Sequence, residues 1–412
     1  MQQKYTRLKL ACYTSNIAMS VVSNISPLLF LTFRSLYGIS YSLLGLLVLV
    51  NFVTQLSVDL IFSFFSRKFN VKKCVKAIPI ITSSGLLLYA AAPLLFPNAV
   101  YLGLVLGTVV FAASGGFVEV LLSPVIAAIP AENPDREMSK LHSVYAWGVV
   151  GVVLFSSLFL LLFGAHRWQW LILLLVLIPV LSAILFFGTK FPPMAEGESA
   201  KGTKGLLGKK MLWVCFLALF LSGAAECTMS QWSSGYLEQA LGIPKIWGDV
   251  FGVALFAMML GLGRTLYAKY GKHIERILLL GAIGAVCCYF ISAVVPVPII
   301  GLIACATTGF CVSMLWPGGL IVVADRIPTG GVVMYAMMAA GGDLGASVGP
   351  QLVGIITDKV MVSPSATEFA MRLGITAEQL GMKCGMLVGM IFPLLAVPVF
   401  FFLLKSRKNT EK

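Results

Sequence analysis

One carboxyl group, that of Glu119, lies in a run of the sequence where charge is costly. The run GGFVEVLLSPVIAAIP, residues 115–130, otherwise holds apolar residues, small residues and proline. At the centre of a membrane-spanning helix a charged side chain costs about 2.5–3.5 kcal/mol, and it normally faces protein or water. Because no Lys or Arg lies in the same run, desolvation favours the protonated form of Glu119. We expect Glu119 to carry a proton, with a purely structural hydrogen bond between helices as the alternative.

A second carboxyl group, that of Glu226, lies in the run LSGAAECTMSQWSSGYL at residues 221–237. Ser222, Glu226 and Ser230 recur at intervals of four, so they share one face of a helix, and Trp232 lies next to that face. A carboxylate near an indole suits a sugar, because hydroxyl groups need acceptors and the C–H face of a sugar stacks on the indole. We expect substrate contacts from Asn51, Gln55, Tyr145, Glu226, Gln231, Trp232, Trp316, Asp343 and Gln351.

A third carboxyl group, that of Asp343, lies in a glycine-rich run. In GGDLGASVGPQLVGIITD, residues 341–358, Asp343, Ser347 and Gln351 fall on one helix face, and Pro350 interrupts the helix partway. The glycines of this run permit neighbouring helices to approach closely. We therefore expect Asp343 to offer a polar face to the substrate and the glycines to serve packing.

Aromatic and imidazole side chains have alternatives that the sequence leaves open. Trp232 also suits the aromatic belt of a membrane interface, and Trp316 also suits ordinary packing. His142 lies three residues before Tyr145, so both lie near one helix face, and a histidine there can relay protons near neutral pH. Capping of the cytoplasmic end of the helix is the alternative for His142.

The elements that must carry these residues are membrane-spanning helices. The 412 residues are 58% hydrophobic and 11% charged, whereas ordinary soluble domains carry about 25% charged residues. Twelve apolar runs are long enough to cross a bilayer core of about 30 Å. The formal charge of +13 comes from short basic clusters between those runs, which is typical of cytoplasmic loops rather than of a nucleic-acid surface. The nine cysteines lie mostly in or beside apolar runs, so we expect neither disulfides nor a metal site.

The basic residues also predict an orientation. With both termini on one side, twenty-four of the Lys and Arg residues lie there and six on the other, which predicts cytoplasmic termini. The Gly- and Lys-rich segment 191–210 is expected to be a cytoplasmic linker between a six-helix domain 1–190 and a six-helix domain 211–412. Gly116-Phe117 and Pro124 recur as Gly309-Phe310 and Pro317 at an offset of 193 residues, which indicates two similar halves. Such a layout is typical of a secondary transporter.

The chain resembles the major facilitator superfamily over essentially its whole length. The resemblance rests on the 6+6 repeat, on Asp59 at the end of the second run and on the basic loop SRKFNVKK that follows it. Within that superfamily, the stretches 119–124 and 141–148 are similar to fucose:proton symporter-type sugar permeases, although Asn24 stands where those permeases place a first-helix acid. The resemblance implies an all-α membrane protein with 12 transmembrane helices in two pseudo-symmetric six-helix bundles, and a cytoplasmic gate formed by Asp59, Arg67 and Arg264.

Two functions remain open on the sequence alone. The first is proton-coupled import of a sugar or similar small polar nutrient by alternating access, and the second is proton-coupled efflux of amphipathic drugs or metabolites. The sequence has no Walker-type motif, HExxH motif or Cys/His ligand cluster, which disfavours an enzyme and an ATP-driven pump. A channel is disfavoured because no filter motif repeats, and a scaffold because no domain lies outside the bilayer. We expect a monomer in a bacterial-type plasma (inner) membrane that uses no cofactor, binds no nucleic acid, and contacts a small-molecule substrate, protons and lipid.

Overall fold

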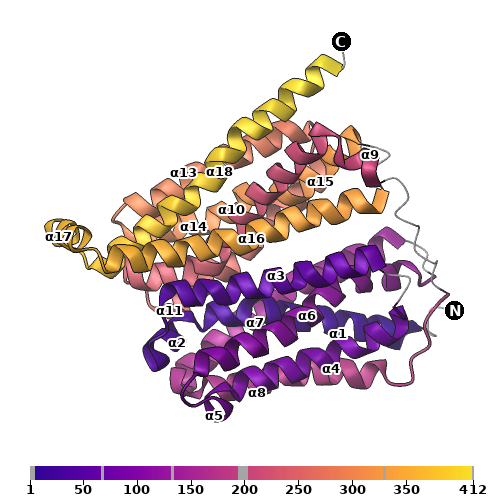
Figure 1. Ribbon diagram of the computed structural model, residues 1–412, viewed down its shortest axis with the longest axis horizontal. Helices are drawn as coiled ribbons and strands as arrows, with labels where there is room; N and C mark the ends of the chain where they lie inside the picture. Colours follow the sequence, from indigo (N-terminus) through magenta and orange to yellow (C-terminus); the bar gives the residue numbers. More distant parts are fainter. Residues whose placement is uncertain (1–4, 66–68, 131–133, 194–202, 328–330, 411–412) are drawn as a thin grey trace. The chain divides into compact units, whose positions relative to one another are not determined.

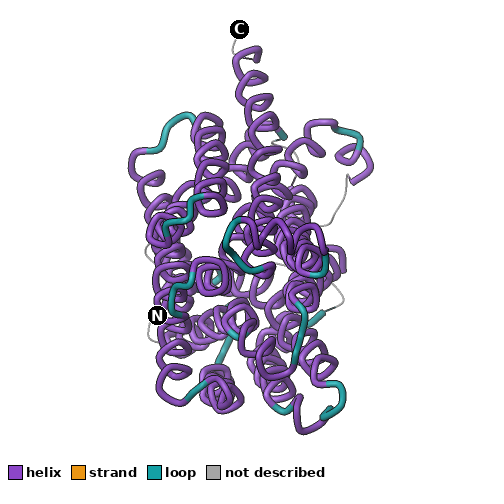
Figure 2. The backbone as a smooth tube through the Cα atoms, turned by 90° about the vertical axis from the view of Figure 1, so that its left-hand side faces the viewer, coloured by secondary structure: helices purple, strands orange, loops and turns teal. Residues whose placement is uncertain are grey.

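The computed structural model is built from helices (Figure 1) and describes residues 5–65, 69–130, 134–193, 203–327 and 331–410. Within these ranges no residue lies in a β-strand, as Figure 2 shows. The described residues include ten helices long and apolar enough to cross a membrane, or eleven when the bent pair α1–α2 is one span. The predicted all-α membrane fold is confirmed. The one predicted run without a counterpart among these spans, the eleventh in chain order, corresponds to α16 (Gly331–Met361).

Internal contacts divide the chain into two compact units, and the first comprises Met1–Tyr37 and Val50–Ala200. The second half of α3 (Tyr41–Phe65) lies in this unit, while the first turns of the same helix group with the second unit. The other elements of the first unit are α1 (Thr6–Leu28), α2 (Phe30–Tyr37), α4 (Val71–Ala90), α5 (Ala92–Leu95), α6 (Val100–Ala127), α7 (Pro134–Phe163), the 3₁₀ turn η3 (Ala165–Arg167) and α8 (Trp168–Phe186).

The second unit comprises Gly38–Leu49 and Lys201–Lys412. It contains the first turns of α3, and its longest helices, α10, α16 and α18, pack against one another. Its elements are α9 (Thr203–Leu207), α10 (Lys210–Leu241), α11 (Lys245–Trp247), the π-helical segment η4 (Gly248–Ala254), α12 (Leu255–Tyr270), α13 (Ile274–Val294), α14 (Pro298–Val312), α15 (Leu315–Arg326), α16, α17 (Pro364–Arg372) and α18 (Ala377–Thr410). The domain boundaries at 190 and 211 stay a prediction.

Small residues let the helices of each unit approach closely. In the first unit, α4 packs along α6, and a Cβ at Gly107 would lie 2.8 Å from Tyr89 Cα. In the second unit, α10 packs along α16, and a Cβ at Gly349 would lie 2.9 Å from the carbonyl oxygen of Ala224. Because lipid removes the hydrophobic drive between helices, such close backbone packing is a main source of their association.

A proline explains why α14 and α15 are separate helices. Pro317 has no N–H group, so the carbonyl oxygen of Ser313, four residues earlier, lacks its usual helical donor. Ser313 and Met314 form the turn between the two helices. The Nε of Arg264 donates a hydrogen bond to the freed Ser313 oxygen at 3.1 Å. The break therefore holds a cationic side chain from α12.

The first turn of α3 is capped by a carboxylate from the same unit. Asp358 of α16 accepts hydrogen bonds from the backbone N–H of Tyr41 at 3.1 Å and of Ser42 at 2.7 Å. The hydroxyl of Tyr41 donates to Glu378 of α18 at 2.7 Å. A carboxylate at a helix N-terminus satisfies free N–H groups and complements the helix dipole. These contacts attach the start of α3 to α16 and α18.

Candidate functional site

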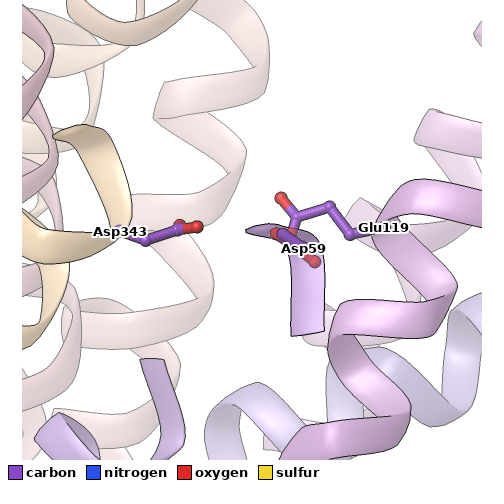
Figure 3. A group of neighbouring side chains, drawn as sticks. All are labelled: Asp59, Glu119 and Asp343. Carbon is purple, nitrogen blue, oxygen red and sulfur yellow. The ribbon is translucent and has the colours of Figure 1, made fainter. Parts of the chain in front are cut away.

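In the first unit, two carboxyl groups from different helices lie together. Asp59 lies near the end of α3 and Glu119 in α6 (Figure 3), and each offers a carboxylate oxygen within 4.8 Å of the other. Neither forms an ion pair with a residue that the structure describes. Two carboxyl groups this close resist double ionisation, so a single proton shared between them is favoured. Asp343, also labelled in Figure 3, belongs to the second unit and is described with it.

Two glycines of α6 make room for this pair. A Cβ at Gly116 would lie 2.8 Å from Val58 Cβ and 3.0 Å from Asp59 Oδ1. A Cβ at Gly115 would lie 3.1 Å from Gln55 Nε2. Since contacts under 3.4 Å are tighter than most real Cβ contacts, a larger residue at Gly116 would push α3 and its carboxyl group away. The two adjacent glycines of the sequence thus set the spacing of the pair.

Asn51, Gln55 and Asp59 form a polar stripe along α3 at intervals of four residues. All three side chains are buried, and Asn51 Oδ1, Gln55 Nε2 and Asp59 Oδ1 have no hydrogen-bond partner among the described residues. A buried polar atom without a partner costs about 1–3 kcal/mol, which a ligand, a proton or a water molecule can recover. Glu119, in contrast, is exposed. The stripe therefore joins unsatisfied polar atoms to a carboxyl group that solvent can reach.

In the second unit, Glu226 of α10 and Arg264 of α12 form an ion pair. Arg264 Nη2 lies 3.6 Å from Glu226 Oε1, and the two side chains are 44% and 19% exposed. The second oxygen, Glu226 Oε2, is buried and has no hydrogen-bond partner among the described residues. Arg264 is held at its Nε by the Ser313 oxygen of the α14–α15 break. The pair is loose, because the N···O distance exceeds the usual charge-assisted hydrogen-bond distance of about 2.7–2.9 Å.

Trp316 of α15 lies beside the same face of α10. A Cβ at Gly223 would lie 3.1 Å from the indole Cζ3, and one at Gly342 would lie 2.6 Å from Cζ2. Gly223 precedes Glu226 by three residues, so the indole and the carboxyl group share one side of the helix. Asp343 follows Gly342 in α16 and is buried. Four helices thus bring Glu226, Arg264, Trp316 and Asp343 to one region of the second unit.

Trp232 and Gln351, two further residues of the predicted site, lie at helix contacts in this structure. Trp232 is fully buried, donates its indole N–H to the Pro350 carbonyl at 2.9 Å, and meets the ring of Tyr41 at 5.9 Å between centroids. Gln351 lies against Gly45, where a Cβ would come within 3.0 Å of Gln351 Oε1. Gln231 is buried. A substrate reaches Trp232 only if the helices around it move.

The α7 residues of the predicted site lie in the first unit. Tyr145 is half-buried on α7, while the side chain of His142 and all of Arg67 lie outside the described residues. At the start of α7, Glu137 accepts hydrogen bonds from Lys140 at 2.7 Å and from Lys9 of α1 at 2.8 Å. These two ammonium groups lower the pKa of Glu137 to about 2. Glu137 was not among the predicted site residues, and its role in the structure is to link α1 to α7.

Comparison with known proteins identifies the family. The sequence model of the Major Facilitator Superfamily matches residues 11–350. The chain belongs to the major facilitator superfamily. Proteins of this superfamily are secondary transporters, so this chain is a multi-pass membrane transporter and not an enzyme. A comparison with curated sequences found no match.

Solved structures of several transporters share the fold at low sequence identity. A bacterial homologue of the human lysosomal transporter Spinster is 16% identical, with 98% of this chain and 97% of that chain covered and a TM-score of 0.71. A D-xylose-proton symporter is 15% identical, with coverage of 96% and 99% and a TM-score of 0.71. The fucose:proton symporter of E. coli is 16% identical, with coverage of 95% and 99% and a TM-score of 0.58. At these identities the likeness shows the fold alone.

Neither pairing in the site is predicted by the sequence. The resemblance implies a gate role for Asp59, and its partner Glu119 lies sixty residues later, so only the packing of α3 on α6 brings them together. The resemblance also implies a gate role for Arg264, which stays a prediction, and it does not indicate the pairing of Arg264 with Glu226. One signal was available for the first pair, because the stripe Asn51, Gln55 and Asp59 has the spacing of a buried helix face.

Proposed function

We propose that this transporter imports a sugar or a similar small polar nutrient together with a proton. The observation that carries the proposal is the Asp59–Glu119 pair, two carboxyl groups within 4.8 Å with no ion pair among the described residues. A site of this kind binds one proton readily and releases it when solvent access or a nearby charge changes. The stripe of Asn51 and Gln55 beside the pair supplies hydrogen-bonding atoms that have no partner in the described residues.

In the proposed cycle the pair couples the proton to movement. With one proton bound, the pair carries a single negative charge, and Glu119 is the member that solvent reaches. Loss of that proton places two negative charges within 4.8 Å, a state that favours renewed access to water. Alternating access of two six-helix halves, 1–190 and 211–412, then exposes the pair to each side in turn. Asp59 thereby acts in proton coupling as well as at the gate proposed for Asp59, Arg67 and Arg264.

Uptake in proteoliposomes tests the proposal. A substrate is first identified by thermal shift with pentoses, hexoses, sugar acids and nucleosides, because a ligand of the folded state raises the melting temperature. An imposed pH gradient should then drive accumulation by the wild type but not by Glu119→Gln, which keeps the size of the side chain and fixes its neutral form. Exchange of internal for external substrate should survive the substitution, since it needs no net proton movement. Glu368→Gln, at an exposed carboxylate of α17, is the matched control and should accumulate substrate normally.

Two results would count against proton-coupled import. Accumulation by Glu119→Gln at the wild-type level would make Glu119 a packing residue. Accumulation driven by an outward rather than an inward proton gradient, with amphipathic cations as the compounds that bind, would favour the efflux function instead.

We also propose that the protein is a monomer in a bacterial-type plasma membrane with both termini in the cytoplasm. The basic asymmetry of the sequence supports this orientation. Ser365 is exposed in α17 and Lys209 is exposed at the start of α10, so each can be replaced by cysteine in a background where the exposed Cys287 is serine. A membrane-impermeant thiol reagent added outside should label Ser365→Cys but not Lys209→Cys, and the reverse pattern would contradict the orientation.

A further inference from the structure

The Arg264 side chain is held in place at one edge only. Its Nε donates to the Ser313 carbonyl oxygen at 3.1 Å. This oxygen has no helical donor, because Pro317 has no N–H. The guanidinium has five N–H donors in a planar fork. Its other contact among the described residues is Glu226 at 3.6 Å, and 44% of the side chain is exposed. Donors of a positioned guanidinium therefore remain free for a further acceptor.

The Glu226 carboxylate is incompletely satisfied next to this guanidinium. Its Oε2 is buried and accepts no hydrogen bond from the described residues. Buried carboxylate oxygens without donors are rare in native structures and mark a place where a ligand donor or an unseen water belongs. A hydroxyl group is the natural donor to such an oxygen. Free donors and a free acceptor thus lie side by side on α12 and α10.

We infer that the substrate is a small hydroxylated carboxylate of the sugar-acid class, with its carboxylate on Arg264 and a hydroxyl on Glu226. This inference rests on the proposed transport function and names the substrate class of the same protein. A guanidinium fork matches a carboxylate with two parallel hydrogen bonds, which a neutral sugar cannot offer. The nearby Glu226 charge disfavours a phosphate dianion more than a carboxylate monoanion, because like charges repel. The half-buried indole of Trp316, on the same side of α10, can cover the C–H face of the ligand.

A binding experiment on the purified full chain tests this class without any proton gradient. The probes are matched pairs that differ only at one carbon, D-galacturonate with D-galactose and D-glucuronate with D-glucose, together with glucose 6-phosphate. Thermal shift and titration calorimetry should show that an acid binds about 10-fold or more tightly than its neutral partner, as loss of a charge-assisted hydrogen bond implies. Glucose 6-phosphate should not bind more tightly than the acids.

Substitutions assign the effect to Arg264. Arg264→Gln should weaken binding of the acid by about 10- to 100-fold and leave the neutral sugar within about 2-fold, while Arg264→Lys should lie between them because it keeps the charge and loses the fork. Arg276→Gln, at an exposed arginine of α13, makes the same charge change and should bind the acid as the wild type does. If Arg264→Gln proves unstable because Glu226 loses its cation, the double variant Glu226→Gln, Arg264→Gln removes both charges and should show the same loss relative to Glu226→Gln alone.

The outcomes separate this inference from the proposed function. It is overturned if neutral sugars bind as well as their acids, if the phosphate ester binds best, if no acid binds, or if Arg264→Gln keeps wild-type affinity for the acid. An acid that binds through Arg264 but moves without a proton would leave the substrate class standing and refute proton coupling. Proton-coupled uptake of a neutral sugar would support proton coupling and refute the substrate class.

Discussion

Gly116→Ala should separate two carboxyl groups that the structure holds together. The new Cβ would lie 2.8 Å from Val58 Cβ and 3.0 Å from Asp59 Oδ1, so α3 and α6 must move apart by a few tenths of an ångström. Overpacking of this kind costs about 1–3 kcal/mol. Replacement of glycine by alanine inside a helix returns about 1 kcal/mol through helix propensity. The net effect on the free energy of unfolding is a loss of up to about 2 kcal/mol.

Gly151→Ala is the matched control, because a Cβ at Gly151 of α7 would meet nothing within 4 Å. It gains the same helix propensity without overpacking, so the difference between the two variants isolates the contact of α6 with α3. Thermal unfolding in detergent, followed by a dye that reacts with buried thiols such as Cys12, should give a lower melting temperature for Gly116→Ala than for Gly151→Ala. Proton uptake should fall in the first variant only. A melting temperature for Gly116→Ala equal to or above that of Gly151→Ala would show that a Cβ at Gly116 does not force α3 and α6 apart.

Two further substitutions test the contacts that hold helix ends. Asp358→Asn removes the charge that caps α3 at the N–H groups of Tyr41 and Ser42, and it should lower the free energy of unfolding by about 1–2 kcal/mol in chemical denaturation. Glu137→Gln should cost about 1 kcal/mol at neutral pH, since its ion pairs are partly exposed. Because the pKa of Glu137 is lowered to about 2, its stabilising effect is present above about pH 4.5 and is lost as the pH falls toward 2, so melting curves of variant and wild type should converge there.

Sequence patterns were sufficient for the fold class but not for the partners of each charged residue. Hydropathy reports how much of a helix is apolar, which is why the spans and the isolated Glu119 stood out. Which helices face each other depends on close packing at glycines. The positions of Gly115 and Gly116 in the sequence do not predict that α3 packs against them. The pairing of Asp59 with Glu119 is therefore a property of the folded unit.

Trp232 and Arg264 illustrate the same limit in the second unit. The sequence placed Trp232 next to a polar stripe, but the carbonyl of Pro350 and the ring of Tyr41 occupy its polar and aromatic surfaces in this structure. The resemblance to the superfamily implies a place for Arg264 at the cytoplasmic gate. In the structure its guanidinium donates to the freed Ser313 oxygen at the α14–α15 break, and the presence of Pro317 in the sequence does not indicate which distant side chain will use that oxygen.

Proton carriage by the Asp59–Glu119 pair is tested by substrate-induced proton uptake. Proteoliposomes loaded with a pH-sensitive dye receive the identified substrate, and the rate of lumen acidification is compared among wild type, Asp59→Asn, Glu119→Gln and Glu137→Gln. The wild type and Glu137→Gln should acidify the lumen, Asp59→Asn and Glu119→Gln should not, and all four should retain substrate exchange. Acidification by Asp59→Asn and Glu119→Gln at the wild-type rate would rule out proton carriage by this pair.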